Sequence, residues 1–400
     1  MELGDTDCSY IDFEMGAIPH HSQLLPEERQ VMETLFKTQS DIMIATPTLA
    51  QGVNLPVDVV LIAGEDRYDS ESKGRDRMDA HEILNAAGRA GRAGFRSQGA
   101  AILVSNKVIG IEKNKLTNDW FDLKSNIFSK GDQCLMVEDP FGKLVEESYE
   151  EENISVEQKM VLMKLSLLGE NERKVLSKSF YEYQLKRDNK ESNSFEERML
   201  QLSSLYEGEE NTPLLELSLK TGVDNKLLTS FYDWLGEGLL FVVYTVEEVL
   251  DLYCSWLEQT PSALSELLTY ESTVELLSNT FGEGRVINEN FISELWKVLK
   301  MYINGSSLKE ISFELNEKQN DHYITATRKF VLKVIPELSY AFSVLAMVHV
   351  QYLKDIGLDE EEIPFAIKNF ATCLKEGVSS EEMLQLKADK HLMRVEAHLL

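Results

Sequence analysis

Short apolar runs alternate with helical patterns over the first 130 residues of the chain. Three runs have the length of a buried strand: Asp41–Ala45, Val57–Ala63 and Ala100–Val104. Apolar positions at helical spacing predict helices over Pro26–Lys37 and residues 79–87. Ala17–Ser22, which contains Pro19, is predicted as a loop. Strands that alternate with helices predict a parallel sheet covered by helices on both faces.

The pattern is helical after an acidic stretch. Pro140, Gly142 and a run of glutamates mark residues 131–153 as a linker. Further on, helices predicted over Pro213–Lys220 and Asn225–Leu235 flank a short turn, which is a helix-turn-helix pattern. Lys226 is the only basic residue in the second helix, and a DNA-reading helix needs several. We therefore expect a winged-helix-like packing module over residues 154–250 and a helical domain over residues 251–400.

The sequence gives little support for a membrane protein, a disulfide-bonded protein or a metal-binding protein. Pro336–Leu353 is apolar nearly all round, which is typical of a buried helix, and no run of 18 apolar residues occurs. Met1–Tyr10 is acidic and polar, unlike a signal peptide. The four cysteines lie far apart and form no C-x-x-C pair. The sequence predicts a cytoplasmic protein with no membrane contact and no metal ligands of its own.

Net charge argues against a surface that is basic throughout. The chain carries a formal charge of -28. Residues 1–130 hold 14 Lys+Arg against 20 Asp+Glu, and the remainder holds 26 against 48. A basic balance is the usual footprint of nucleic-acid binding. Any contact of this chain with nucleic acid must therefore use a local basic patch.

Two glycine-containing segments stand out in the α/β frame. The segment A-T-P-T-L-A-Q-G-V-N-L-P, Ala45–Pro56, leaves a predicted strand for a loop, where ligand sites of parallel sheets lie. The segment N-A-A-G-R-A-G-R-A-G, Asn85–Gly94, ends a helix and places Arg89 and Arg92 among glycines. Glycines allow close approach of the backbone to a ligand, and arginines contact phosphate oxygens in bidentate geometry.

The two segments resemble motifs V and VI of superfamily-2 helicases, in the branch that includes Ski2-type RNA helicases and archaeal repair helicases. H-H-S-Q-L-L, from His20 to Leu25, resembles the segment that precedes motif V in that branch. Order and spacing agree over about residues 16–105. The resemblance implies that residues 1–130 form the second RecA-like motor domain, with a partial parallel sheet that lacks an earlier strand and helix of the family.

The resemblance also implies roles for individual residues. Arg92 matches the arginine finger, which stabilises charge on the γ-phosphate of ATP, and Arg89 matches the neighbouring phosphate-contacting arginine. Gly52, Asn54, Asn85 and Gly88 are expected to bind the nucleotide, and Gly52 and Asn54 match motif V positions that couple it to the strand. Contacts with the nucleic-acid backbone are expected at Thr48 and His21. Asn85 departs from the glutamine usual in motif VI, and this shorter amide puts a contact near the nucleotide in doubt.

The 400 residues contain neither G-x-x-x-x-G-K-[ST] nor a D-E-x-H segment. The expected partners are therefore single-stranded DNA or RNA and a first RecA-like half, in cis or as a separate chain. That half would bind most of the ATP and Mg²⁺, so the chain alone is expected to hydrolyse ATP negligibly. A split gene, a fragment and a stand-alone pseudoenzyme remain open. The alternative function is a non-catalytic nucleic-acid or protein binding module that acts with a partner ATPase.

Overall fold

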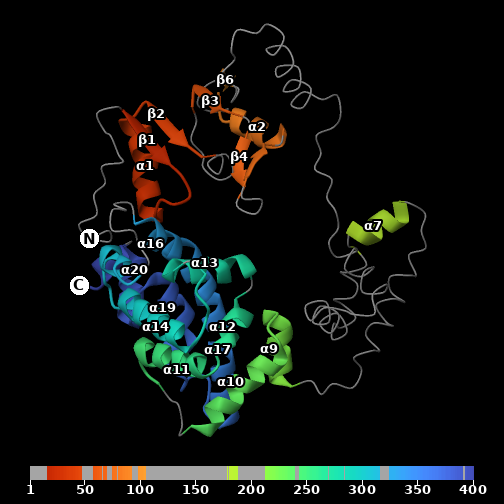
Figure 1. Cartoon of the computed structure of the whole chain (residues 1–400), viewed down its shortest axis with the longest axis vertical. Coiled ribbons are helices and arrows are strands. Elements are labelled where there is room, and N and C mark those ends of the chain that lie inside the picture. Colours follow the sequence, from red (N-terminus) through yellow and green to blue (C-terminus); the bar gives the residue numbers. More distant parts are fainter. Residues whose placement is uncertain are drawn as a thin grey trace. The chain divides into compact units, whose positions relative to one another are not determined.

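The structure is a computed structural model of the whole chain, shown in Figure 1. It describes residues 16–46, 57–64, 66–69, 74–78, 80–91, 98–104, 178, 180–187, 212–238, 243–268, 270–282, 284–315, 324–390 and 392–400. The chain divides into two units, one of Cys8–Val137 and one of Glu138–Leu400 with Met1–Asp7. Each unit is best understood by itself.

The first unit begins with a β-α-β arrangement. Strand β1 (Ala17–His20) pairs in parallel with β2 (Ile42–Ala45), and α1 (Pro26–Thr38) connects them. Pro26 occupies the first turn of α1, where its missing N–H costs no hydrogen bond. Met32 of α1 packs with Ile18 and Leu24 in a small core. The helix predicted over Pro26–Lys37 and the strand predicted over Asp41–Ala45 are confirmed.

The loop predicted over Ala17–Ser22 is wrong, because Ala17–His20 form strand β1. Pro19 lies opposite Ile44 in the parallel register. Among the described strands β1 pairs with β2 alone. Proline has no N–H to give to a ladder, yet an edge strand needs donors on one side only. The sequence rule that proline breaks a strand therefore fails here.

A second parallel pair carries the other predicted elements. Strands β3 (Val59–Ala63) and β6 (Ala100–Val104) lie side by side, with Leu61 opposite Ile102. A short antiparallel hairpin, β4 (Asp66–Asp69) and β5 (Gly74–Arg77), precedes helix α2 (Ala80–Ala87). Ile83 of α2 packs on Ile62 of β3. Alternation along each strand therefore places one apolar face under α2.

The expectation that helices cover both sheet faces is not met in the described residues. On the face opposite α2, Val59 is 54% exposed and Leu61 is 60% exposed. Ile44 of β2 is 66% exposed in the same way. The two described helices of this unit, α1 and α2, each pack on the face that carries Ile18 or Ile62. The described strands thus include two separate parallel pairs, β1–β2 and β3–β6, each with one face packed under a described helix.

The second unit is helical in its described part (Figure 1). Its elements are α7 (Phe180–Arg187), α9 (Pro213–Thr221), α10 (Asn225–Glu237), α11 (Val246–Gln259), α12 (Ser262–Leu267), α13 (Glu271–Phe281), α14 (Glu289–Ile303), α15 (Leu308–Ser312), α16 (Thr325–Lys329), η3 (Phe330–Val334), α17 (Ile335–Asp355), α18 (Phe365–Lys368), α19 (Phe370–Glu376), α20 (Glu381–Lys390) and α21 (Arg394–Ala397). Helix α11 runs through residue 250, where the sequence placed a domain boundary.

Helix α17 is the centre of this unit, as its all-round apolar pattern predicted. Phe342 of α17 packs near Tyr253 of α11 and Phe370 of α19, and all three rings are buried. The continuous helix Thr325–Asp355 is long and apolar enough to cross a membrane, yet 56% of its most apolar stretch is buried inside the fold. Such burial is typical of a core helix in a helical domain.

The predicted helix-turn-helix forms and packs against α17. Gly222 ends α9 in the left-handed conformation, with φ 78°, and the Asp224 side chain caps α10 by accepting from Lys226 N–H. The Tyr340 hydroxyl donates to the Thr221 carbonyl at 2.7 Å, and the Tyr232 hydroxyl donates to Asp355 at 2.7 Å. These contacts tie both helices to α17.

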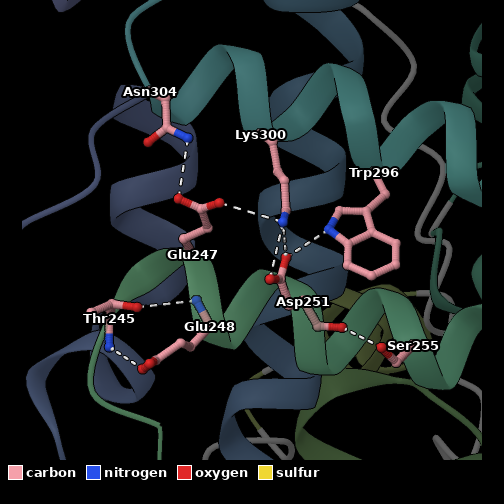
Figure 2. A network of polar contacts seen from close by, with 8 residues as sticks. All are labelled: Thr245, Glu247, Glu248, Asp251, Ser255, Trp296, Lys300 and Asn304. Carbon is pink, nitrogen blue, oxygen red and sulfur yellow. Dashed lines mark hydrogen bonds and ion pairs between the residues drawn. The ribbon is translucent and has the colours of Figure 1, made fainter.

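A network of polar contacts joins α11 and α14, as Figure 2 shows. Lys300 lies 2.7 Å from Asp251 and 3.4 Å from Glu247. The Trp296 indole N–H donates to the same Asp251 carboxylate at 2.8 Å. The pKa of Lys300 is raised by its hydrogen bonds and ion pairs with these carboxylates, which outweigh the opposing effect of burial. The network joins α11 to α14.

Arg394 has a structural position rather than a solvated one. Its side chain is buried, and its Nη1 donates to the Tyr302 carbonyl at 2.6 Å. Nη2 donates to the Ser306 carbonyl, and the guanidinium lies 4.6 Å from the centre of the Tyr302 ring. The cation therefore satisfies carbonyls at the C-terminal end of α14, where a helix dipole favours positive charge. A basic residue this close to the C-terminus would ordinarily lie on a solvated surface, so its burial is a finding of the structure.

Candidate nucleotide and nucleic-acid site

The turn that follows α2 contains Gly88 and Arg89. Gly88 N–H donates to the Leu84 carbonyl at 2.8 Å, and Arg89 N–H donates to the Ala86 carbonyl at 3.2 Å. Gly91 N–H donates to the Val57 carbonyl at 3.0 Å. These amides serve the fold and do not form an anion-binding nest of free N–H groups. Phosphate contact at this turn must therefore come from side chains.

The bond from Gly91 to Val57 joins the two segments singled out in the sequence. Val57 follows directly on Pro56, the last residue of the first segment, and forms an isolated parallel bridge with Ala90 of the second. Residues 33 positions apart in the chain are thereby held in hydrogen-bond contact. The structure thus brings the end of the first segment to the arginine turn of the second.

Gly91 occupies its position because no other residue fits there. Its φ is +66°, in the left-handed region. A Cβ built on Gly91 would lie 2.5 Å from the backbone nitrogen of Gly99, so the two backbones are packed directly against each other. Gly99 was not among the residues predicted to matter. The sequence hint at Gly99 is its position directly before the strand predicted over Ala100–Val104.

The side chains at the turn differ in exposure. Asn85 and Gly88 are exposed, whereas Ile83 on the same helix is buried against β3. Arg89 is half-buried and makes contacts within the fold. Helix α2 therefore turns its apolar face to the sheet and leaves Asn85 and the start of the turn accessible to a ligand.

The ends of β1 and β2 form a second part of the candidate site. His20 lies opposite Ala45 at the carboxyl ends of these parallel strands, and Thr46 N–H donates to the His20 carbonyl at 3.2 Å. His20 is 5% exposed, and its Nε2 lies 3.2 Å from Glu33 of α1. Glu33 was missed by the sequence reasoning, because its partner lies 13 residues away. The pair fixes the strand end from which His21 emerges.

His21 itself is half-buried and shapes a turn. Its Nδ1 accepts from Gln23 N–H at 3.3 Å, and its carbonyl accepts from Leu24 N–H at 3.2 Å. It leaves the same edge of the strand pair as Thr46, two residues before the predicted contact at Thr48. Four of the predicted site residues lie outside the described residues: Thr48, Gly52, Asn54 and Arg92.

The described residues contain no assembled group of metal ligands. Within them, no cluster of three or more His, Cys, Asp or Glu side chains is placed to hold a metal ion. Arg89 and the exposed Asn85 offer donors that suit phosphate oxygens, and Asn85 adds one acceptor. The turn suits electrostatic contact with a phosphate that is held mainly by other groups.

Comparison with known proteins identifies this part of the chain. Residues 4–94 match the family model described as helicase conserved C-terminal domain. The RQC trigger complex helicase SLH1 of Saccharomyces cerevisiae is 32% identical over 139 residues, which are 34% of this chain and 7% of that protein. The helicase resemblance seen in motifs V and VI is thus confirmed for the N-terminal quarter.

Further relatives give the same picture. Activating signal cointegrator 1 complex subunit 3 of Homo sapiens is 32% identical over 109 residues, 27% of this chain and 5% of that protein. The DExH-box ATP-dependent RNA helicase DExH14 of Arabidopsis thaliana is 32% identical over 112 residues, 28% of this chain and 5% of that protein. The chain thus spans only a small part of the length of these curated relatives.

Proposed function

We propose that the chain is the C-terminal part of an ATP-dependent nucleic-acid helicase, in which residues 1–130 act as the second RecA-like domain. The observation that carries the proposal is the arginine turn. Its described amides donate to the carbonyls of Leu84, Ala86 and Val57, which supports a phosphate contact through side chains rather than through a backbone cradle. That is the chemistry of an arginine finger acting on a nucleotide bound elsewhere.

In this proposal ATP and Mg²⁺ are held mainly by a first RecA-like half, in cis or as a separate chain. The two halves close on bound ATP and reopen after its hydrolysis. On closure, Arg92 and Arg89 stabilise the negative charge on the γ-phosphate. Asn85 and Gly88 contact the nucleotide, and Gly52 and Asn54 couple it to the strand-binding side.

Single-stranded DNA or RNA would contact the edge from which β2 emerges. Thr48 and His21 are the proposed contacts, and they address the backbone rather than the bases. The support is geometric, because the carboxyl ends of β1 and β2 lie together and His21 follows β1 directly. The relative from Arabidopsis thaliana is named an RNA helicase, which makes RNA the first strand to test.

The winged-helix-like module over residues 154–250 and the helical domain over residues 251–400 are proposed as supports of the motor. Helices α9 and α10 pack on α17 through Tyr340 and Tyr232. The exposed side chains of α10 include Lys226, Asp233 and Glu237, a net acidic surface. This charge favours a packing role for the helix pair over base reading.

Reconstitution tests the proposal. A polypeptide carrying a P-loop and a D-E-x-H segment, encoded beside this chain, would be mixed with it and ATP hydrolysis followed with single-stranded RNA. We expect turnover that needs both chains and falls about 10³-fold with Arg92→Ala. Arg92→Lys, which keeps the charge but not the fork, is the matched variant. Turnover by the mixture that is unchanged in both variants would refute the arginine-finger role.

The second candidate is a non-catalytic module that binds nucleic acid or protein and acts with a partner ATPase. The absence of G-x-x-x-x-G-K-[ST] from the 400 residues favours it as much as a divided enzyme. The gene neighbourhood discriminates between the two. An adjacent reading frame with a P-loop and a D-E-x-H segment supports the divided helicase, and a neighbourhood without one supports the module.

A further inference from the structure

Helix α7 combines exposed aromatic rings with basic side chains. Phe180 is 45% exposed and Tyr183 is 60% exposed. Their ring centres are 6.2 Å apart and their planes differ by 22°, so the rings are stacked on one side of the helix. Lys186 and Arg187 follow one helical turn later and are exposed. Residues three and four apart lie on one helix face, so rings and cations form one stripe.

The charge of this segment is opposite to that of its surroundings. Residues 171–190 hold six Lys+Arg against three Asp+Glu. Residues 131–400 as a whole hold 26 against 48. Among the described residues of the stretch, Lys178, Lys186 and Arg187 are all exposed. A chain with net charge -28 repels polyanions over most of its surface, so such a patch has a distinct electrostatic role.

Aromatic rings and cations in one stripe match the chemistry of a single strand. Unpaired bases stack on exposed rings, and the phosphates beside them pair with Lys and Arg. A duplex hides its base faces and would leave both rings without a partner. Lys and Arg in the last turn also favour the helix dipole, but that effect gives no reason for two exposed rings.

We propose that the stripe formed by Phe180, Tyr183, Lys186 and Arg187 is a second binding surface for single-stranded nucleic acid, separate from the strand contacts proposed in residues 1–130. It rests on the proposed function only in the choice of strand. Binding is sequence-tolerant, because every base presents a π-face and the cations address phosphates. The surface would keep a strand attached to an otherwise acidic part of the chain.

Fluorescence anisotropy with labelled oligo-U and oligo-dT of about 12 nucleotides tests the surface. The full chain is titrated at several salt concentrations. We expect Phe180→Ala and Tyr183→Ala each to weaken binding about tenfold. Lys186→Gln with Arg187→Gln should reduce the slope of log K against log salt by about 0.7 for each cation removed. Ultraviolet cross-linking of the same complex should attach the strand to a peptide containing Phe180 or Tyr183.

A matched control lies on α15, where Phe313 is 76% exposed and Lys309 lies 5.8 Å from its ring centre. The neighbouring Glu310 and Glu314 make the surroundings of that pair acidic. Phe313→Ala with Lys309→Gln should leave the affinity and the cross-link unchanged. Thermal melting checks that each variant remains folded.

Each outcome separates this surface from the motor contacts. His21→Ala and Thr48→Ala reduce affinity through residues 1–130 and should leave the α7 cross-link in place. Normal affinity and salt slope in the α7 variants overturn the second surface while the helicase proposal stands. Displacement of the strand by polyglutamate, together with normal binding by the ring variants, would show a general polyanion surface and overturn it too. No binding by the full chain at low salt overturns both proposals.

Discussion

The backbone of Gly91 lies directly against that of Gly99, so closely that a Cβ on Gly91 would be 2.5 Å from the Gly99 nitrogen. This contact holds the turn that carries Arg89 at the start of strand β6. The bond from Gly91 N–H to the Val57 carbonyl, at 3.0 Å, fixes the same turn to the start of β3. The position of Arg89 thus depends on the backbone contacts of Gly91.

Replacing Gly91 tests this dependence. Gly91→Ala should destabilise the first unit by about 2–3 kcal/mol, because the left-handed φ is strained and the new Cβ overlaps Gly99. Hydrogen exchange at the Gly91 amide should accelerate as its bond to Val57 weakens. Gly88→Ala is the control, since its nearest atom is the Leu84 carbonyl oxygen at 3.2 Å. Equal effects of the two substitutions would contradict the account.

Removing the buried cation of the second unit should also be costly. Arg394→Ala removes the guanidinium donor from the Tyr302 and Ser306 carbonyls and empties space over the Tyr302 ring. We expect a loss of about 2–4 kcal/mol in the free energy of unfolding, measured with urea. Lys390→Ala, on an exposed position of α20, should change it by less than about 0.5 kcal/mol. A small effect of Arg394→Ala would mean that the side chain is not buried.

Burial of Tyr253 predicts a loss of stability at alkaline pH. Desolvation raises the pKa of its hydroxyl well above the ordinary 10.0. In the unfolded chain the phenol ionises near pH 10, whereas the folded chain keeps its proton. The contribution of Tyr253 to the free energy of unfolding is therefore fully present below about pH 10. It falls above that pH, by about 1.4 kcal/mol for each pH unit.

Tyr253→Phe should remove this part of the alkaline slope. Urea unfolding between about pH 9 and pH 11 measures it. Burial also raises the pKa of the Cys254 thiol, so some slope should remain in the variant. Tyr244→Phe, at a residue that is 73% exposed, is the control and should keep the full slope. An unchanged slope in Tyr253→Phe would show that the hydroxyl is not buried.

Most of the elements that local pattern predicted are present in the structure. Ile42–Ala45, Val59–Ala63 and Ala100–Val104 are strands because their apolar side chains recur at strand length between polar turns. Helix α17 was predicted from apolar residues on all its faces. Strand β1 was missed, because Pro19 indicates a break when its edge position is unknown.

The candidate site was predictable where motifs carry it and not where distant residues meet. Asn85, Gly88 and Arg89 were singled out by their resemblance to motif VI, and their roles stay predictions. Gly99 and Glu33 were missed, because their partners Gly91 and His20 lie across intervening segments and leave no periodic trace. The burial of Arg394 was missed for the same reason, since a basic residue near a terminus usually indicates a solvated surface.

ATP hydrolysis by the purified 400-residue chain tests the central claim most directly. The chain is assayed with and without single-stranded RNA or DNA, beside Arg92→Ala. The account predicts turnover no higher than that of Arg92→Ala under either condition, because the arginines act on a nucleotide that the first RecA-like half must hold. Turnover that the strand stimulates and Arg92→Ala abolishes would contradict it, and would place a complete phosphate site within these 400 residues.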